Sequence, residues 1–384
     1  MTTTGIPLSL YLHFPWCVRK CPYCDFNSHT AGERASRDRY VDALVADLAV
    51  ESARADGRPL QSIFLGGGTP SFFDAGQIGK ALEAVARSFT LEPDCEITME
   101  ANPGTVDCGR LIDYRRAGVN RLSLGAQSFD AGSLGRLGRI HGPDEIVTAY
   151  VEAQQAGFRS INLDIMYALP GQTHVMAIAD ITRTIELSPQ HVSWYQLTLE
   201  PNTVFHARPP QDLPDEDQAA EMQDRGHELL IAAGYRQYEV SAYARPGFGC
   251  RHNLNYWAFG DYLAAGAGAH AKYSDREGRI WRYRKPANPA VYMEWMERGG
   301  GDTDLHAVDH ATAAFEFMLN GLRLPAGFSE DRFATRTGVS FASVAGVVRD
   351  AAREGLLERA GRDEWRPTRL GLRYLNELQA RFLP

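Results

Sequence analysis

The chain has 384 residues, of which 44% are hydrophobic, and its formal net charge at pH 7 is −8. This length allows two domains, or one large domain with an appendage, and the hydrophobic share excludes a disordered chain because it supplies a full core. The negative charge excludes the basic surface that nucleic-acid binding requires.

Neither secretion nor membrane insertion is indicated by the sequence. No run approaches the ~18 consecutive apolar residues of a membrane span. Met1–Ser9 has neither the positive charge nor the apolar run of a signal peptide. Six cysteines without a secretory signal indicate a reducing compartment. We therefore expect a cytoplasmic protein.

The first half of the chain alternates short apolar segments with amphipathic stretches. The expected strands are Leu8–Phe14, Ser62–Leu65, Glu96–Glu100, Arg121–Ala126, Ser160–Tyr167 and Val192–Leu199. The expected helices include Arg39–Ala53, Ala75–Phe89, Pro143–Ala156 and Ala177–Leu187. This alternation is typical of βαβ units and a parallel sheet. Six strand–helix units, with no seventh unit of similar quality, predict an α/β fold with an incomplete (β/α)6 barrel. A doubly wound sheet would give a similar pattern.

The second half begins with a linker and ends in short helices. Arg208–Asp217 is rich in proline and acidic residues, which predicts a linker before a helix at Gln218–Ala233, and a second linker spans Arg298–Thr303. Helices are expected at Ala311–Leu319, Asp331–Thr337, Phe341–Glu354 and Gly371–Phe382, with a hairpin formed by Leu356–Ala360 and Glu364–Pro367. The pattern resembles a winged helix, and its mixed charges favour packing against the barrel. We expect a core domain at 1–236, a connecting segment at 237–302 and a mostly helical C-terminal domain at 303–384.

Polar motifs follow the predicted strands near their carboxyl ends. Cys17–Cys24 follows the first strand and Gly66–Pro70 the second, while Glu100, Gln127 and Asp164 lie in or after the third, fourth and fifth. Barrel enzymes gather their chemistry at this end of the strands. The positions of these motifs therefore favour the barrel over the doubly wound sheet.

Cys17, Cys21 and Cys24 form a tight triplet with the spacing Cys-x3-Cys-x2-Cys. Three thiolates leave one iron of a [4Fe–4S] cube without a protein ligand, and an open coordination position is where metal chemistry takes place. Structural zinc needs four ligands in paired knuckles, and the sequence has no second Cys-x2-Cys. Unrelated thiols are the other alternative, so the triplet favours an iron–sulfur cluster.

The triplet, the glycine run and the strand-end groups resemble the radical S-adenosylmethionine superfamily. Within it, most of the chain is similar to the oxygen-independent coproporphyrinogen III dehydrogenase family. The resemblance implies a [4Fe–4S] cluster on the three cysteines, with S-adenosylmethionine on the open iron. It implies cofactor contacts from Tyr11, Tyr23, Gly67, Gly68, Thr69, Glu100, Gln127, Arg139 and Asp164, with Thr198 and His270 near two further family positions. Taken singly, the glycines could form a tight turn and the polar groups a buried network.

The run His252–Trp257 reads His-Asn-x-x-Tyr-Trp, which resembles the signature of the HemW-type heme chaperones of this family. Imidazole is a common axial ligand of heme iron, and aromatic rings can pack on a porphyrin face. The resemblance implies a heme site at His252, Tyr256 and Trp257. A core histidine with aromatic neighbours is the alternative, and Cys250 is either a second candidate ligand or a plain thiol.

Two departures separate the chain from the dehydrogenases of the family. Phe26 stands where those enzymes carry a further cysteine, and Tyr11 lies near the chain start, where they have a long N-terminal extension. Both departures favour a heme chaperone that transfers heme to an unidentified acceptor, with respiratory and membrane-associated proteins as candidates. Radical decarboxylation of coproporphyrinogen III in porphyrin biosynthesis is the alternative, so enzymatic activity is left open. A monomer and a homodimer both fit, and no nucleic-acid partner is expected.

Overall fold

The computed structural model describes residues 5–30, 34–301 and 303–384. Its main feature is a 12-stranded sheet with six parallel strands in sequential order at its centre. These are β1 (Leu8–Phe14), β4 (Leu60–Gly67), β5 (Leu91–Ala101), β6 (Arg121–Gln127), β7 (Ser160–Tyr167) and β8 (His191–Gln196). Among the described strands, the order runs from β14 to β9 without closing on itself. The expected α/β fold with an incomplete barrel is confirmed.

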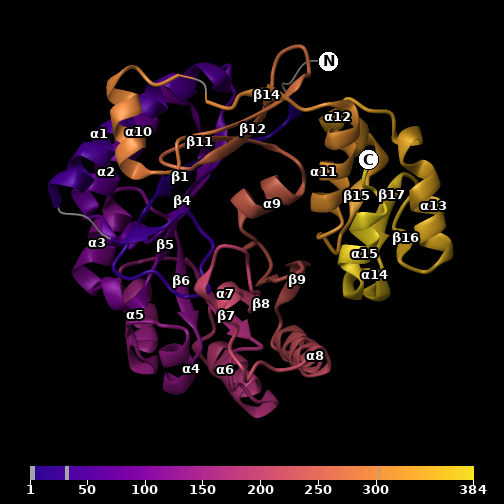
Figure 1. Cartoon of the computed structure of the whole chain (residues 1–384), viewed down its shortest axis with the longest axis horizontal. Helices are drawn as coiled ribbons and strands as arrows, with labels where there is room; N and C mark the ends of the chain where they lie inside the picture. Colours follow the sequence, from indigo (N-terminus) through magenta and orange to yellow (C-terminus); the bar gives the residue numbers. More distant parts are fainter. Residues whose placement is uncertain (1–4, 31–33, 302) are drawn as a thin grey trace.

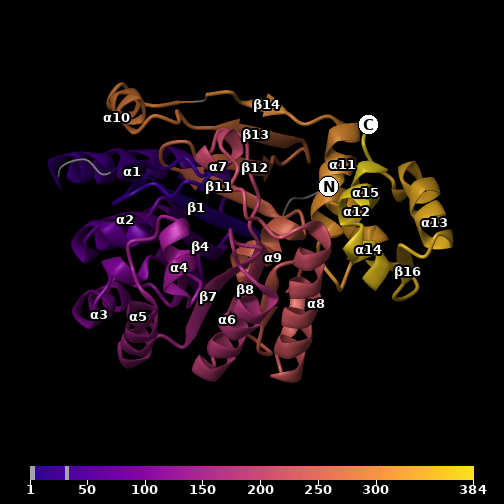
Figure 2. The same cartoon turned by 60° about the horizontal axis from the view of Figure 1, so that its bottom comes forward.

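Helices cover the outer face of the parallel strands (Figures 1 and 2). They are α1 (Arg34–Ala55), α2 (Ala75–Ser88), α3 (Cys108–Arg116), α4 (Ala131–Arg136), α5 (Pro143–Gln155), α6 (His174–Leu187) and α8 (Glu216–Ala232). Capping boxes fix two helix starts: Asp74 with Gln77 at α2, and Asp215 with Gln218 at α8. In each box the aspartate accepts from the backbone N–H of the glutamine, whose side chain accepts in return.

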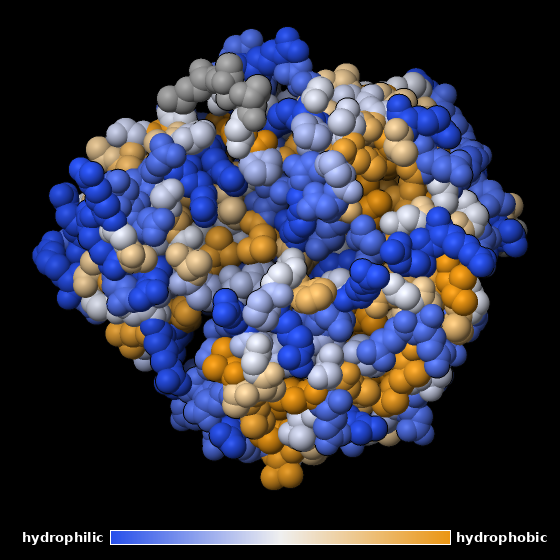
Figure 3. All heavy atoms as spheres, turned by 180° about the vertical axis from the view of Figure 1, so that it is seen from behind, coloured by the Kyte–Doolittle hydropathy of each residue, from blue (hydrophilic) through white to orange (hydrophobic). Residues whose placement is uncertain are grey.

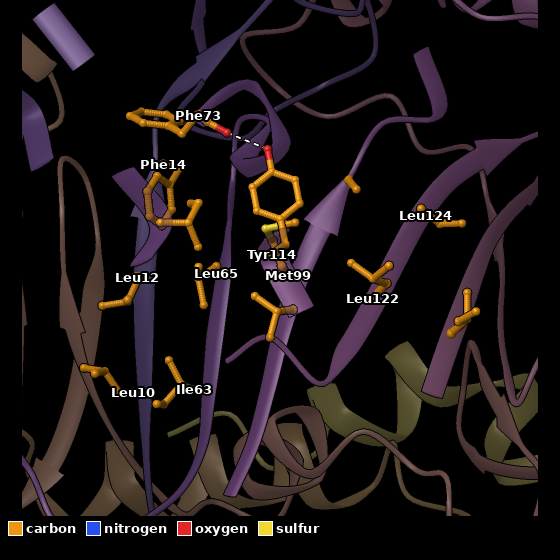
Figure 4. Close-up of a cluster of buried hydrophobic side chains, with 14 of the residues drawn as sticks. Leu10, Leu12, Phe14, Ile63, Leu65, Phe73, Met99, Tyr114, Leu122 and Leu124 are labelled. Atoms are coloured by element: carbon orange, nitrogen blue, oxygen red, sulfur yellow. Dashed lines mark hydrogen bonds between the residues drawn. The ribbon is translucent and has the colours of Figure 1, made fainter. Parts of the chain in front are cut away.

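Alternate side chains of the strands point to the two faces of the sheet. One set is apolar and packs under the helices, with Leu10, Leu12 and Leu65 completely buried (Figure 4). The Tyr114 hydroxyl donates to the Phe73 carbonyl oxygen at 2.6 Å, which ties α3 to the turn after β4. The other set is polar, as in Ser9 and Ser62, whose hydroxyls lie 2.7 Å apart. The inside of the incomplete barrel is therefore a polar, buried environment.

Strands between Arg236 and Ala307 extend the sheet at both edges, slightly beyond the expected connecting segment 237–302. β11 (Asp261–Ala265) pairs in parallel with β1, and β12 (His270–Ser274), β13 (Ile280–Arg284) and β14 (His306–Ala307) follow antiparallel. At the other edge β10 (Ala242–Ala244) pairs antiparallel with β8 and with β9 (Arg236–Glu239). The sequence pattern indicated none of these strands. The division into 1–236, 237–302 and 303–384 stays a prediction, and its positions 1–4, 31–33 and 302 lie outside the described residues.

The C-terminal part is mostly helical and lies beside the barrel (orange to yellow in Figure 1). It contains α11 (His310–Gly321), β15 (Phe328–Ser329), α12 (Glu330–Thr337), η4 (Phe341–Ser343), α13 (Ala345–Arg353), β16 (Leu357–Arg359), β17 (Glu364–Pro367), α14 (Arg369–Arg373) and α15 (Leu375–Ala380). The hairpin expected about Gly361 is present as β16 and β17, and β15 adds a third strand. Two expected helices are each divided: one into η4 and α13, the other into α14 and α15 at Tyr374.

The remaining elements lie in loops or connect the two parts of the fold. They are β2 (Trp16–Cys17), β3 (His29–Thr30), η2 (Pro70–Phe72), η3 (Pro103–Thr105), α7 (Val204–Ala207), α9 (Arg251–Trp257) and α10 (Pro289–Glu297). Seen from behind, hydrophobic side chains form separate patches among hydrophilic ones (Figure 3). Within the described part of the chain, none of the helices combines the length and apolar character needed to cross a bilayer.

Candidate cofactor and heme site

The carboxyl ends of the parallel strands surround a cavity of about 620 Å³. This volume is in the range of small-molecule sites. Most of the residues predicted from the sequence line it: Cys17, Cys21, Tyr23, Cys24, Gly67, Gly68, Thr69, Glu100, Gln127, Arg139, Asp164, Thr198 and Trp257. Four others, Tyr11, His252, Tyr256 and His270, are not among the lining residues. The structure thus brings together groups that lie up to 240 positions apart in the sequence.

The three cysteines lie on the loop after β1, each half-buried and each beside a polar group. The Thr69 hydroxyl donates to Cys17 Sγ at 3.3 Å, Arg139 Nη1 donates to Cys21 Sγ at 3.7 Å, and Cys24 Sγ lies 3.8 Å from a serine hydroxyl. Burial raises the pKa of the Cys17 and Cys24 thiols. Among the described residues, no three potential ligands converge tightly enough for one metal ion. A [4Fe–4S] cluster does not require the three sulfur atoms to converge on one point, because each thiolate binds a different iron.

Asn27 anchors the downstream end of the cysteine loop. Its side-chain nitrogen donates to the carbonyl oxygens of Ala267 and Ala287, at 2.9 and 2.8 Å. His13 Nε2 lies 2.8 Å from the Asn27 carbonyl oxygen, and His29 Nε2 lies 3.1 Å from Asn27 Oδ1. The loop is therefore held by the segment that follows β11 as well as by β1.

The glycine run after β4 is required by the protein's own packing. Gly67 has φ +109°, and a Cβ atom there would collide with the His13 imidazole ring. A Cβ atom on Gly68 would lie 2.8 Å from the Phe14 carbonyl oxygen. Both glycines line the cavity, but the close approach that needs them is to β1. The tight-turn interpretation thus accounts for their conformation.

Two buried carboxyl groups face the cavity from β5 and β7, the strands on either side of β6. Burial and then the Asp164 carboxylate raise the pKa of Glu100 to about 8, while the backbone N–H of Gly67 donates to Glu100 Oε2 at 3.2 Å. Burial also raises the pKa of Asp164, whose oxygens accept from Asn162 Nδ2 at 2.8 Å and the Ser123 hydroxyl at 3.1 Å. Two acids in this environment are suited to a cationic ligand.

Gln127, at the end of β6, and Arg139 also line the cavity. Gln127 has φ +72°, a left-handed conformation that is rare outside glycine, and its Oε1 accepts from the Tyr195 hydroxyl at 2.7 Å. Arg139 Nη2 donates to the Gly125 carbonyl oxygen at 2.7 Å, while its Nε is buried without a hydrogen-bond partner. Backbone strain and an unpaired buried donor at one place are typical of a ligand site.

The His-Asn-x-x-Tyr-Trp motif forms the short helix α9, whose start is held by Glu96. Glu96 Oε1 accepts from the backbone N–H groups of Arg251 and His252, at 2.9 and 3.4 Å, and from Cys250 Sγ at 3.5 Å. Burial raises the pKa of Cys250 to about 12, so this group is a thiol at neutral pH. The plain-thiol interpretation of Cys250 agrees with this environment.

His252 packs inside the barrel rather than against the cavity. Its ring centroid lies 5.0 Å from that of Phe64 and 6.3 Å from that of Tyr11. Its Nδ1 is buried without a partner, and burial lowers the pKa of His252 to about 3. The imidazole is therefore neutral, which is the form that binds metals.

A chain of hydrogen bonds connects the acidic wall of the cavity to the start of α9. Asn162 donates to Asp164 and accepts from His191 Nδ1 at 2.6 Å. His191 Nε2 in turn accepts from the Tyr238 hydroxyl at 2.7 Å, and the Tyr238 oxygen accepts from the Cys250 backbone N–H at 3.2 Å. Burial holds the pKa of His191 well below its ordinary value, so the imidazole in this chain is neutral.

The far end of the cavity contains residues that the sequence interpretation missed. Asn253 and Trp257, four positions apart on one face of α9, line it together with Glu239 and Arg323. Asn253 lies within the recognised motif, so helical spacing from Trp257 could have indicated it. Glu239 and Arg323 carry no signal in the sequence, because only tertiary packing brings them to α9. We call Glu239, Asn253, Trp257 and Arg323 the distal end.

Comparisons with known proteins agree with this architecture. Residues 11–182 match the Radical SAM superfamily, and residues 308–374 match the HemN C-terminal domain. The solved structure described as coproporphyrinogen III oxidase (HemN) from Escherichia coli superposes with a TM-score of 0.82, covering 98% of this chain and 90% of that one. At 23% identity, this likeness shows the fold alone. The fold and the domains define a radical S-adenosylmethionine protein with a HemN-type C-terminal domain.

Curated relatives give the narrower family. The chain is 47% identical to the heme chaperone HemW of Escherichia coli (strain K12) and 46% identical to that of Haemophilus influenzae, in each case over 98% of both chains. It is 35% identical to the heme chaperone HemW of Bacillus subtilis (strain 168), over 92% of this chain and 93% of that one. The chain belongs to the HemW heme chaperone family.

Proposed function

We propose that this protein is a heme chaperone, which binds heme and passes it to an acceptor protein. The observation that carries the proposal is that Asn253 and Trp257 of the motif helix line the same cavity as the three cysteines. The names of the relatives support it, as does Phe26, which offers no thiol and whose side chain is 54% exposed. Decarboxylation of a porphyrinogen is the alternative activity of this fold.

Cys17, Cys21 and Cys24 would hold a [4Fe–4S] cluster. The donor set fits this group, because three thiols face one cavity and none of the described carboxylates or histidines completes a single-ion site with them. A bound cluster would supply one iron with an open coordination position and a source of single electrons. The chain contributes partial shielding from water and polar neighbours for the sulfur atoms.

S-adenosylmethionine would occupy the cavity beside the cysteines. Its positive charge suits Glu100 and Asp164, and its carboxylate suits Arg139, which has an unpaired buried donor. Tyr23, Gly67, Gly68, Thr69 and Gln127 would line the remainder. Tyr11 does not line the cavity, and its ring packs against those of Phe64 and the motif histidine.

Heme, as cargo, would meet the motif helix at the distal end. Trp257 offers a ring to the cavity, and Tyr256 packs edge-on against Trp257 at 4.9 Å. His252 is the proposed iron ligand because its imidazole is neutral and Nδ1 has no partner. Since His252 does not line the cavity, iron ligation requires its ring to leave the packing against Phe64.

Anaerobic reconstitution followed by heme titration tests this function. We expect the wild type to show a cluster absorbance and a stoichiometric Soret band. Cys21→Ser should lose the cluster, whereas Cys108→Ser, a cysteine outside the cavity, should keep it. His252→Ala should weaken heme binding by about tenfold or more, whereas His227→Ala on α8 should not.

The same preparation distinguishes the two activities. A wild type without a Soret band, or a His252→Ala variant that binds heme equally well, would contradict the proposed heme site. Formation of protoporphyrinogen from coproporphyrinogen III, with reductant and S-adenosylmethionine present, would instead favour the dehydrogenase. A full cluster in Cys21→Ser would refute the ligand assignment.

A further inference from the structure

Arg323 reaches the distal end of the cavity from the C-terminal domain. It follows α11, and its guanidinium carbon lies 4.4 Å from the centre of the Trp257 ring. Its side chain is 28% exposed, whereas that of its partner Glu239 is only 6% exposed. A cation is thus stacked directly on the motif tryptophan, at the wall of the cavity.

The hydrogen bonds of Arg323 leave much of the guanidinium unused. Nε donates to Glu239 Oε1 at 2.9 Å, and Nη2 donates to the same oxygen. Glu239 Oε2 accepts instead from the Ser241 backbone N–H at 3.1 Å. Within the described residues, Nη1 has no hydrogen-bond partner. A guanidinium carries five N–H donors, so the edge formed by Nη1 and Nη2 can still take a second carboxylate.

Besides Arg323, two other side chains of the C-terminal domain contact the motif helix or the residue after it. Asn320 Nδ2 donates to the Tyr256 carbonyl oxygen at 3.5 Å, and Arg336 Nη1 donates to the Ala258 carbonyl oxygen at 2.5 Å. These two bonds already brace the helix through its backbone. Arg323 differs because it contacts the helix through the Trp257 ring and faces the cavity.

We propose that Arg323 binds a carboxylate of the cargo at the distal end, through the free edge of its guanidinium. The proposal rests on the proposed heme function: the ligand class is a tetrapyrrole with ionised propionate side chains, whose ring would contact Trp257. Arginine forms paired, charge-assisted hydrogen bonds with carboxylates, and stacking on an aromatic ring fixes the plane of the fork. Glu239 holds the guanidinium in place and competes with the propionate for it.

The alternative is that Arg323 and Glu239 form a purely structural ion pair that joins the two domains. Two substitutions, which should have opposite effects on hemin binding, distinguish this alternative from the proposal. Arg323→Gln should weaken binding of free-acid hemin by about tenfold, the loss expected for a hydrogen-bonded charge. It should leave binding of hemin dimethyl ester unchanged, because the ester has no propionate charge. Glu239→Gln removes the competing carboxylate and should strengthen hemin binding. If the Arg323–Glu239 pair were purely structural, both variants would instead bind both hemin and its dimethyl ester more weakly.

Arg282 with Glu316 is the matched control. This Arg–Glu pair also joins the sheet to α11, with the closest atoms 2.7 Å apart and side chains 24% and 20% exposed, but it lies outside the cavity. Arg282→Gln should bind both ligands like the wild type, and Arg323→Lys should keep part of the preference for the free acid. Thermal unfolding of each variant shows that it is folded.

The outcomes separate this assignment from the function on which it depends. A wild type without a Soret band overturns the proposed function and this assignment together. A wild type that binds hemin, with an Arg323→Gln variant of equal affinity or an unchanged preference over the dimethyl ester, overturns the carboxylate assignment alone.

Discussion

Glu100 shows how burying a single carboxyl group at the wall of the cavity lowers the stability of the folded protein. Its pKa of about 8 means that the folded protein holds a proton that the unfolded chain, with a carboxyl of ordinary pKa, releases above about pH 4.5. Folding stability therefore falls as the pH rises from about 4.5 to about 8. A cationic ligand would reverse this by favouring the ionised form.

Glu100→Gln should stabilise the cluster-free protein at pH 8.5 by on the order of 2–4 kcal/mol. It should have little effect near pH 4.5, because the wild-type carboxyl is then protonated in both states. Denaturant unfolding at the two pH values measures this difference. Glu228→Gln, on the exposed face of α8, is the control. A gain in Glu100→Gln that is the same at both pH values would show that desolvation of the charge is not its cause.

Individual residues were predictable where the chemistry is visible in the chain itself. The cysteine triplet and the groups at the strand ends follow from spacing and strand order, and they line one cavity as expected. Arg323 could not be predicted, because it reaches Trp257 only through the docking of another domain. Nor did the sequence show that the His13 ring leaves no room for a Cβ atom at Gly67.

At the scale of elements, α9 depends on one acceptor in the barrel floor. Glu96 holds the first N–H groups of this helix, while Arg121, only 3% exposed, lies 3.9 Å from its other oxygen. Glu92, earlier on β5, contacts the same helix only through the Arg251 side chain, at 2.5 Å. The two glutamates therefore form a natural comparison of a buried cap and a surface ion pair.

Glu96→Ala should cost about 2–4 kcal/mol of unfolding free energy, because two N–H groups lose their acceptor and the buried Arg121 loses its counter-ion. Glu92→Ala should cost less than about 1 kcal/mol, as is typical of exposed pairs. Denaturant unfolding gives both values, and Trp257 fluorescence reports on the helix. Equal losses for the two variants would contradict the capping role of Glu96.

Element boundaries were predictable mainly where local signals mark them. The capping aspartates place the starts of α2 and α8 within two residues of expectation. The start of α9 has no side-chain cap of its own, since its acceptor is more than 150 positions away. The strands β11 to β14 are short and pair mostly antiparallel, so they lack the βα alternation that indicated the core.

At the scale of the whole molecule, buried charges join the connecting segment to the core. Lys285, after β13, lies 2.7 Å from both Asp47 and Glu51 of α1, and the side chains of all three are at most 1% exposed. Tyr283 and Tyr292 also donate to these carboxylates. The position of this segment beside β1 therefore depends on complete pairing of these groups.

Lys285→Met should destabilise the protein by about 3–5 kcal/mol, because it removes the buried cation that Asp47 and Glu51 share, although Arg54 still pairs with Glu51. Arg39→Ala, which breaks an exposed pair between α1 and Glu297, should leave the unfolding free energy nearly unchanged. Thermal and denaturant unfolding compare them. A loss in Lys285→Met no greater than that in Arg39→Ala would show that packing alone holds the segment.

The anchoring of Asn27 has a consequence for how fast a cofactor can be loaded. Because its side chain already joins the cysteine loop to Ala267 and Ala287, the downstream end of the loop is positioned before any ligand arrives. Ordering a free loop costs conformational entropy for each residue fixed, and here part of that ordering occurs during folding. Assembly of a cluster on the three cysteines would then have to immobilise a shorter stretch of chain, so the β11–β13 region, distant in sequence, would speed the loading through Asn27.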